Sequence, residues 1–281
     1  MNQSNAKPPA DTHTWLGLSG RVCVVTGGGS GIGGDAAREL AAAGARVAVL
    51  DRNADAASAV AAAIGRTGGH AISLTADVAN PEAVAAAAEQ LLRGLGPCEV
   101  LVNNAALVGY AGALMDGDMQ LWDRMLAVNL TGALTCTRAF GRQMINAGRG
   151  GAIVNVASIC GHVPLAYGGA YSVGKSGVMM MTRMLALELA EHHIRCNSVS
   201  PGLVRTPATE AAYVEAEVAD ARKKMVPTGR VADPVDLANV ITFLASDRSG
   251  YVNGQDILVD GALSQTLMSL VPKPTKPIEP K

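Results

Sequence analysis

Tyr171 and Lys175 are the two side chains whose types and spacing point most directly to chemistry. They are four residues apart in a segment predicted to be helical, so they share one helix face about one turn apart. A phenol with a pKa of about 10 is a weak base at neutral pH, but a nearby ammonium group favours the phenolate and lowers that pKa. The pair is therefore predicted to transfer a proton, with Lys175 as activator rather than nucleophile.

Two further polar residues are predicted to meet this pair. Ser158 follows an apolar segment over residues 152–156, and a hydroxyl at the end of that strand can donate to a carbonyl oxygen or orient an alcohol. Asn129 lies inside the preceding predicted helix, where its amide can hold a water that links Lys175 to solvent. A Tyr-x-x-x-Lys pair also arises by chance in many helices, so the order of the other motifs has to support this interpretation.

A glycine-rich segment over residues 26–34 follows the first apolar run and opens a helix. Such a turn lets backbone N–H groups approach a pyrophosphate, and the helix N-terminus adds partial positive charge. Two registers are open, since Gly29, Gly31 and Gly34 fit G-x-G-x-x-G, whereas Gly27, Gly31 and Gly33 fit G-x-x-x-G-x-G. No Walker lysine follows the loop. The predicted cofactor contacts are Gly27, Ser30, Gly31, Ile32 and Gly33.

The end of the second apolar run indicates which cofactor is used. Asp51 stands there, eighteen residues after Gly33, where a carboxylate accepts hydrogen bonds from an adenosine ribose and repels a 2′-phosphate. This favours NAD over NADP, although Arg52 offers a guanidinium group that can partner a phosphate. Asp77 and Val78 follow the third run and are predicted to reach the adenine ring.

Short apolar runs alternate with alanine-rich segments along the chain. Apolar runs without polar alternation fit strands buried on both faces of a parallel sheet. The predicted strands cover residues 21–26, 45–50, 70–75, 99–102, 152–156, 194–199 and 256–259, and the predicted helices cover 31–43, 53–66, 81–94, 122–147, 169–191 and 234–245. The fold class is therefore α/β, a single-domain Rossmann-type doubly wound sheet of about seven parallel strands with helices on both faces.

This catalytic domain is predicted to cover residues 19–264, after a flexible N-terminal arm over residues 1–18. Residues 203–230 are an insertion with a short helical stretch around 209–224, predicted to act as a substrate lid. Residues 265–281 form a Pro- and Lys-rich tail.

Charge and cysteine usage narrow the function classes. The 281 residues hold 23 Lys and Arg against 24 Asp and Glu, so the chain has no basic footprint for nucleic acid or an anionic membrane. Five scattered cysteines without a C-x-x-C pair give no metal-site signal and favour reduced thiols in a cytoplasmic protein. The N-terminus lacks the pattern of a signal peptide, and the charge-free span 150–174 is interrupted by Pro164 and glycines, which disfavours a membrane helix.

Taken together, the motifs make the chain resemble the classical short-chain dehydrogenase/reductase family from about residue 19 to 262. The matching stretches are T-G-x-x-x-G-x-G at 26–33, the acidic strand end at Asp51, D-V at 77–78, N-N-A at 103–105, V-N-L-T-G at 128–132, Ser158 thirteen residues before Tyr171, Y-S-V-G-K at 171–175, and P-G at 201–202 followed by Thr206. Ala106 stands where the family usually has glycine.

The resemblance implies roles for individual residues. Asn129, Ser158, Tyr171 and Lys175 would be catalytic, and Tyr171 and Lys175 would also contact the cofactor. Of the remaining cofactor contacts, Asn104 and Ala105 would line the groove, and Pro201, Gly202, Val204 and Thr206 would face the nicotinamide. The catalytic helix and the 122–147 helix would form subunit contacts of a homotetramer, with a dimer as the alternative.

The implied function is NAD-dependent interconversion of a secondary, apolar or cyclic alcohol and its ketone. Leu107, Val108, Val163, Pro164, Leu165 and Tyr167 are the candidate walls of an apolar substrate pocket. Arg205 in the lid could bind a carboxylate, but a solvated arginine is commoner. The alternatives are an NADPH-dependent 3-ketoacyl reductase and, more distantly, a non-catalytic dinucleotide-sensing protein.

Overall fold

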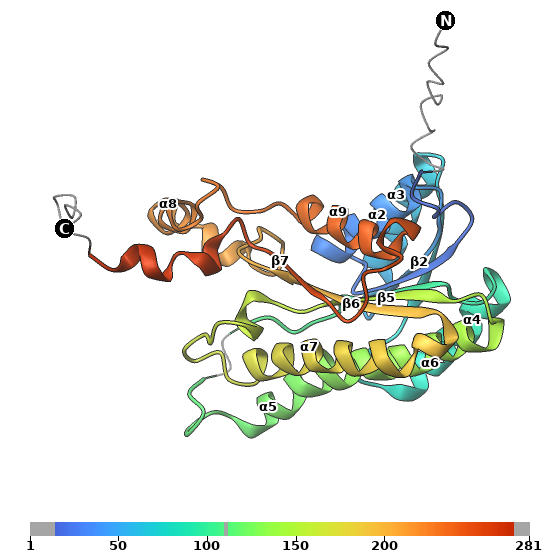
Figure 1. Ribbon diagram of the computed structural model, residues 1–281, viewed down its shortest axis with the longest axis horizontal. Coiled ribbons are helices and arrows are strands. Elements are labelled where there is room, and N and C mark those ends of the chain that lie inside the picture. The colour runs from blue at the N-terminus through green and yellow to red at the C-terminus, as the bar shows by residue number, and fades with distance from the viewer. Residues whose placement is uncertain (1–14, 110–111, 273–281) are drawn as a thin grey trace, which may run out of the picture.

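The computed structural model describes residues 15–109 and 112–272. Seven parallel strands form one sheet in the order β3-β2-β1-β4-β5-β6-β7 (Figure 1). They are β1 (Val22–Thr26), β2 (Arg46–Asp51), β3 (His70–Thr75), β4 (Val100–Asn103), β5 (Gly151–Val156), β6 (Ile194–Pro201) and β7 (Asp256–Val259). The order reverses between β1 and β4, and ligands of open parallel sheets bind beside the strand ends at such a reversal. The predicted fold class is confirmed.

The strands lack polar alternation because both faces of the sheet are covered. In β1, Cys23 and Val25 point into one core, while Val22 and Val24 point into the other. All five residues of this strand are buried. A strand placed between two helical layers buries every side chain, which is why its sequence is a continuous apolar run.

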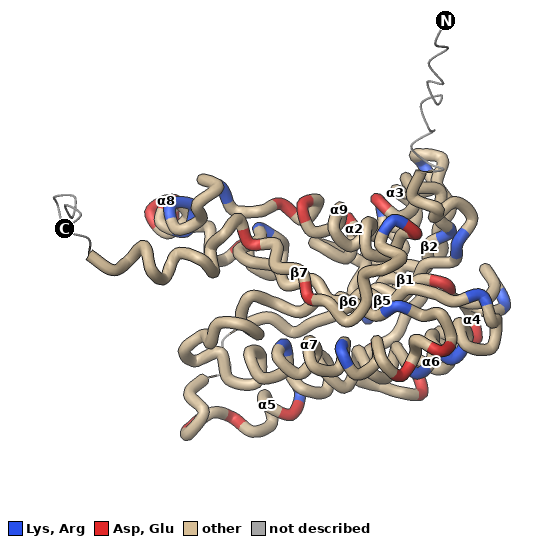
Figure 2. Tube along the Cα trace, viewed as in Figure 1, with Lys and Arg blue, Asp and Glu red and all other residues tan. Residues whose placement is uncertain are grey.

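Helices pack on both faces (Figure 1). The layer over the first core contains α2 (Gly31–Ala42), α3 (Ala54–Arg66) and α9 (Pro234–Ala245). The opposite layer contains α4 (Pro81–Gly94), α5 (Met119–Leu126), α6 (Gly132–Ala147) and α7 (Ala170–Glu188). Asn80 caps α4 by accepting from the backbone N–H groups of Glu82 and Ala83, with Pro81 at the first helical position. The charged residues lie mainly on the helices and loops (Figure 2).

The long helix expected over residues 122–147 is irregular. α5 and α6 are joined by a π-helical segment, Ala127–Thr131, with Asn129 at its centre. Such wide turns are frequent at functional sites, because they break the regular hydrogen-bond ladder. The periodicity of the sequence predicted the helix but contained no signal for this irregularity.

The segment predicted to be a lid, residues 203–230, begins after β6 and holds two short helical elements. They are a 3₁₀ turn, Glu210–Tyr213, and α8 (Ala216–Met225). Val204 forms a bridge with Ala232, which ties the start of the lid to its end. The two ends of this segment therefore lie side by side at the edge of the sheet.

The boundaries of the domain differ slightly from the expectation. Leu18 is fully buried in the core and Leu16 packs against it, so the last residues of the predicted arm belong to the folded domain. The rest of that arm, residues 1–14, lies outside the described residues. At the other end, Leu267–Leu270 forms a 3₁₀ turn, and the tail from residue 273 also lies outside them. In the described part of the chain, no helix is both long and apolar enough to span a bilayer.

Candidate active site

A cavity of about 760 Å³ opens at the carboxyl ends of the strands. It brings together nearly all the residues predicted from sequence. Gly27, Ser30, Gly31, Ile32, Asp51, Arg52, Asp77, Val78, Asn104, Ala105, Ser158, Tyr171, Lys175, Pro201, Gly202, Val204 and Thr206 line it. Gly33 and Asn129 are not among the lining residues.

The glycine turn resolves the two registers left open by the sequence. Gly27 and Gly31 have φ values of +61° and +53°, in the left-handed region that favours glycine. A Cβ at Gly33 would collide with the carbonyl oxygen of Gly27 and the amide of Asn104. Gly34 has room, since the nearest atom to such a Cβ would be 3.5 Å away. A Cβ at Gly29 would also be crowded, by Ala56 and Asp51, so Gly33 against Gly34 is the contrast that supports G-x-x-x-G-x-G.

Asn104 holds this turn in place. Its side-chain nitrogen donates to the carbonyl oxygens of Thr26 and Gly27, both at 3.1 Å. The Thr26 hydroxyl in return accepts from the backbone N–H groups of Asn104 and Ala105. These bonds join the end of β1 to the end of β4, so the first N–H groups of α2 keep a fixed direction toward the cavity.

Asp51 is fixed by backbone hydrogen bonds at the end of β2. One carboxylate oxygen accepts from the N–H of Gly29 at 3.0 Å and the other from the N–H of Asn53 at 2.9 Å. Arg52, beside it, is exposed and also lines the cavity. The site therefore presents a preoriented carboxylate with an exposed guanidinium neighbour.

Asp77 has an unpredicted partner. Arg124, from α5, donates to one carboxylate oxygen at 2.6 Å, and the N–H of Ala79 donates to the other at 2.9 Å. Both bonds lower the pKa of Asp77. Arg124 lines the same end of the cavity, and only the tertiary fold brings it next to a residue 47 positions away.

Tyr171 lies at the N-terminal end of α7 beside Ser158. Burial raises the pKa of the Tyr171 phenol, and a hydrogen bond with Ser158 lowers it in part. The sequence-based expectation of an ammonium-lowered pKa is therefore wrong in direction for the protein without ligands. The reason is that the Lys175 nitrogen lies 5.8 Å from the centre of the Tyr171 ring and desolvation of the phenol outweighs its influence.

Lys175 is 3% exposed. Its ammonium group donates to the carbonyl oxygen of Val156 at 2.7 Å, and burial lowers its pKa from 10.5 to about 8. The side chain is still mostly protonated at neutral pH, and it is poised close to the range in which it releases that proton.

Asn129 uses its side chain differently from the expectation. Its amide oxygen accepts from the N–H of Leu107 at 2.7 Å, and its amide nitrogen donates to the carbonyl of Leu107 at 2.9 Å. The amide group therefore contacts the loop after β4, and the water link to Lys175 stays a prediction. These two hydrogen bonds hold the backbone of Leu107, whose side chain lines the cavity.

The turn that follows Ser158 is anchored to the far edge of the sheet. His162 lies 2.7 Å from one carboxylate oxygen of Asp256, whose other oxygen accepts from the hydroxyls of Ser198 and Ser200. The Ser158 hydroxyl itself accepts from the N–H of Cys160 at 3.1 Å. These contacts fix the short 3₁₀ turn Ile159–Gly161, which carries Cys160 into the cavity wall.

The predicted apolar wall is only partly correct. Leu107, Val108 and Leu165 line the cavity, whereas Val163, Pro164 and Tyr167 do not and are exposed. Arg205 is bound by Glu210 through two hydrogen bonds of 3.0 and 2.6 Å, and it is outside the lining. The cavity is also lined by Ile159, Cys160, Leu203 and Arg222, for which no sequence motif gave a separate signal.

The sheet order, the glycine turn after β1 and the cleft at the strand ends define a Rossmann-type nucleotide-binding fold. Residues 27–264 match the family model described as enoyl-(acyl carrier protein) reductase. The chain belongs to the classical short-chain dehydrogenase/reductase family, whose members are NAD(P)-dependent oxidoreductases.

Similar proteins include two named bacterial dehydrogenases. A D-threitol dehydrogenase of Mycolicibacterium smegmatis is 40% identical over 87% of this chain and 93% of its own length. A cis-4-hydroxycyclohexanecarboxylate dehydrogenase of Sinomonas cyclohexanicum is 40% identical over 86% of this chain and 95% of its own. A gluconate 5-dehydrogenase from Burkholderia cenocepacia, solved with NADP and tartrate, is 33% identical with a TM-score of 0.83, covering 88% of this chain and 96% of its own.

Proposed function

We propose that this protein is an NAD-dependent dehydrogenase that interconverts a secondary alcohol and its ketone, with Tyr171 as general acid and base. The observation that carries the proposal is the meeting of Ser158, Tyr171 and Lys175 with the glycine turn in one cleft. A nucleotide-binding protein without catalysis would need the turn but not this buried, polar trio. The non-catalytic alternative is therefore disfavoured.

The residues of the cleft fit a nicotinamide dinucleotide. The glycine turn is packed tightly against the end of β4, where a Cβ at Gly27 or Gly33 would collide with Asn104, and the N-terminus of α2 opens beside it without an acidic residue in its first turn. Gly27, Ser30, Gly31 and Ile32 would hold the phosphates, Asp51 the adenosine ribose, and Pro201, Gly202, Val204 and Thr206 the nicotinamide end. When bound, NAD⁺ accepts a hydride.

The side chains of the protein handle the proton. In the oxidative direction, the Tyr171 oxygen takes the hydroxyl proton of the alcohol, and in reduction it returns a proton to the carbonyl oxygen. Ser158 donates to the substrate oxygen and orients it. Lys175, held at Val156, supplies positive charge near the phenolate that forms. The buried positions of these groups keep their geometry fixed.

The substrate end of the cleft has apolar walls from Leu107, Val108 and Leu165. The lid over residues 203–230 covers this end, with Leu203, Thr209 and Arg222 among its lining residues. The named activities of the similar proteins concern a polyol and a cyclic hydroxy acid. We propose a cyclic or branched aliphatic secondary alcohol that the lid encloses.

A panel of secondary alcohols tested with NAD⁺ checks the reaction class. We expect reduced nicotinamide to form with cyclic and branched secondary alcohols, and the matching ketones to be reduced in the reverse direction. Tertiary alcohols of the same shape are the control, because they carry no hydrogen on the reacting carbon. A protein that binds NADH but oxidises no member of the panel, and reduces no ketone, would contradict the proposal.

We propose NAD rather than NADP as the preferred cofactor. The support is Asp51, whose carboxylate is oriented by the N–H groups of Gly29 and Asn53 toward the position of the adenosine ribose. The same charge disfavours an NADPH-dependent 3-ketoacyl reductase. A related protein solved with NADP shows that the family accommodates either cofactor, so the preference rests on this residue.

Asp51→Asn is expected to move the preference toward NADP. The substitution removes the repelling charge and leaves Arg52 free to pair with a 2′-phosphate, so the ratio of kcat/KM for NADP over NAD should rise about tenfold or more. Steady-state kinetics with both cofactors measure this ratio. Asp55→Asn on α3 is the matched control, since Asp55 is exposed and outside the cavity lining. An unchanged ratio in Asp51→Asn would rule out Asp51 as the discriminating residue.

We also propose that the protein is a homotetramer. Met180, Met184 and Leu187 are exposed on α7, and Leu134 is exposed on α6. An apolar outer face on neighbouring helices supports a subunit contact, because monomeric proteins rarely leave such patches in water.

A further inference from the structure

Two buried polar atoms inside the lid have no hydrogen-bond partner among the described residues. They are the Nε of Arg222, on α8, and the hydroxyl of Tyr213, on the preceding 3₁₀ turn. The Arg222 guanidinium lies 4.7 Å from the centre of the Tyr213 ring, so the two groups are stacked together. Arg222 lines the cavity that also contains Ser158 and Tyr171.

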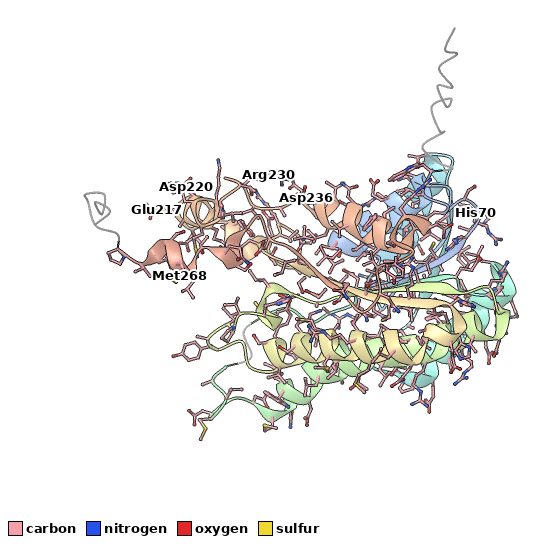
Figure 3. The ribbon with its side chains drawn as sticks, in the orientation of Figure 1. His70, Glu217, Asp220, Arg230, Asp236 and Met268 are labelled. Atoms are coloured by element: carbon pink, nitrogen blue, oxygen red, sulfur yellow. The ribbon has the colours of Figure 1, made fainter. Side chains whose placement is uncertain are left out.

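The charge on Arg222 is not matched by a carboxylate in the described part of the protein. Arg205, on the other hand, lies 5.8 Å from the same ring and is neutralised by Glu210. The acidic residues of α8 are exposed and lie at the periphery of the molecule (Figure 3), where Asp220 pairs with Lys224 at 2.6 Å. A cation in the wall of a cavity without a counter-charge among the described residues is unfavourable, so the position of Arg222 calls for an anionic ligand.

We propose that Arg222 binds a carboxylate carried by the substrate, with the guanidinium group stacked on the Tyr213 ring. The proposal rests on the alcohol dehydrogenase function argued above and names its substrate class, a hydroxy acid. A guanidinium group forms two parallel hydrogen bonds to a carboxylate, which gives both strength and orientation. The stacked phenol ring keeps the guanidinium plane in place.

The rest of the cleft sets the remaining features of this substrate. Leu107, Val108 and Leu165 line the cavity with apolar surface. A hydroxy acid with an aliphatic or cyclic body therefore fits these walls, with its hydroxyl at Ser158 and Tyr171 and its carboxylate at the lid. Because the cation is carried by the lid, binding of the acid also draws the lid over the reacting carbon.

The anionic group that Arg222 binds could instead be the pyrophosphate of the cofactor. Thr206 and Pro207 of the lid lie next to Gly31 in the glycine turn, so the lid reaches the phosphate site as well. The glycine turn and the N-terminus of α2 already offer N–H groups to the pyrophosphate. Among the described residues of the lid, Arg222 is the basic residue that lines the cavity and can bind a substrate carboxylate. We therefore assign the Arg222 site to the substrate, and the experiment separates the two sources.

Kinetics with 3-hydroxycyclohexanecarboxylate and its methyl ester test the assignment. In the unchanged protein we expect kcat/KM for the acid to exceed that for the ester by about 30–100-fold. Arg222→Met should lower this acid-to-ester ratio by about 30–100-fold, the loss expected for a charge-assisted bidentate contact. Tyr213→Phe keeps the stacked ring and should leave the ratio within about threefold. Lys223→Met, the same charge change at an exposed neighbouring residue, is the matched control and should leave the ratio unchanged.

A binding measurement keeps the test independent of turnover. Cyclohexanecarboxylate is titrated calorimetrically into the enzyme saturated with NADH, and its Kd should rise at least about tenfold in Arg222→Met. The Kd for NADH should stay within about threefold.

Three results would overturn the inference: an acid-to-ester ratio near one in the unchanged protein, equal loss of acid and ester activity in Arg222→Met, or a large loss of NADH affinity, which would assign Arg222 to the pyrophosphate. If neither acid nor ester is oxidised but the carboxylate still binds through Arg222, it is the proposed function that fails.

Discussion

Tyr171→Phe is expected to lower kcat by about a thousandfold or more, because it removes the phenol oxygen that is proposed to accept the alcohol proton. The phenyl ring fills the same space, so the packing of α7 on the sheet is retained. The Kd for NADH should change by less than about threefold. Steady-state kinetics and fluorescence titration with NADH measure the two quantities separately.

Tyr167→Phe is the matched control for this experiment. Tyr167 is four residues earlier, is 67% exposed and does not line the cavity, so loss of its hydroxyl should leave kcat nearly unchanged. A Tyr171→Phe protein that keeps more than about a tenth of the turnover would refute the assignment of the general base. A loss of NADH binding in the same variant would point to a structural defect instead.

Lys175→Met is expected to have opposite effects on activity and on stability. Turnover should fall by about a hundredfold or more, because the phenolate loses its nearby positive charge. The free energy of unfolding at neutral pH should rise by about 1–3 kcal/mol, since burial lowers the pKa of this lysine from 10.5 to about 8 and each pKa unit corresponds to about 1.4 kcal/mol. Loss of the bond to Val156 limits the gain.

The pH dependence provides the check on this explanation. The pKa of Lys175 is 10.5 in the unfolded chain and about 8 in the folded protein. Below pH 8 the folded protein therefore carries the full destabilisation of a buried charge, and this destabilisation declines as pH rises to 10.5. The stability advantage of Lys175→Met should therefore be full below pH 8 and shrink as pH rises from 8 to 10.5. Denaturant unfolding at several pH values measures it, with exposed Lys223→Met as control. A constant difference across that range would contradict the buried-charge explanation.

The order of strands and helices follows from local patterns in the sequence. The apolar runs at β1 and β2 are continuous because each strand lies between two helical layers, and Pro81 after Asn80 marks a helix start by its own backbone chemistry. The wide turn at Asn129 has no comparable local signal. It is held by a hydrogen bond pair to Leu107, 22 residues earlier, and such distant pairing is not visible in residue periodicity.

The candidate site also has some features that follow from local sequence and others that depend on the whole fold. The spacing of Tyr171 and Lys175 is a local property of one helix, and the glycine turn with Asp51 is a local property of one β-α-β unit. The direction of the Tyr171 pKa was not predictable, because burial depends on everything that packs around the phenol. Likewise, only the folded lid shows that Arg205 is neutralised by Glu210.

The sequence by itself determined the sheet, the nucleotide-binding turn and the helix that pairs a phenol with an ammonium group, since each depends on residues near one another in the chain. The tertiary structure alone decided the register of the glycine turn, through the collision that a side chain at Gly33 would make with Asn104. It also decided which lid cation lines the cleft, by placing Arg222 there. These outcomes depend on distance and desolvation between remote segments, which exist only once the chain has folded.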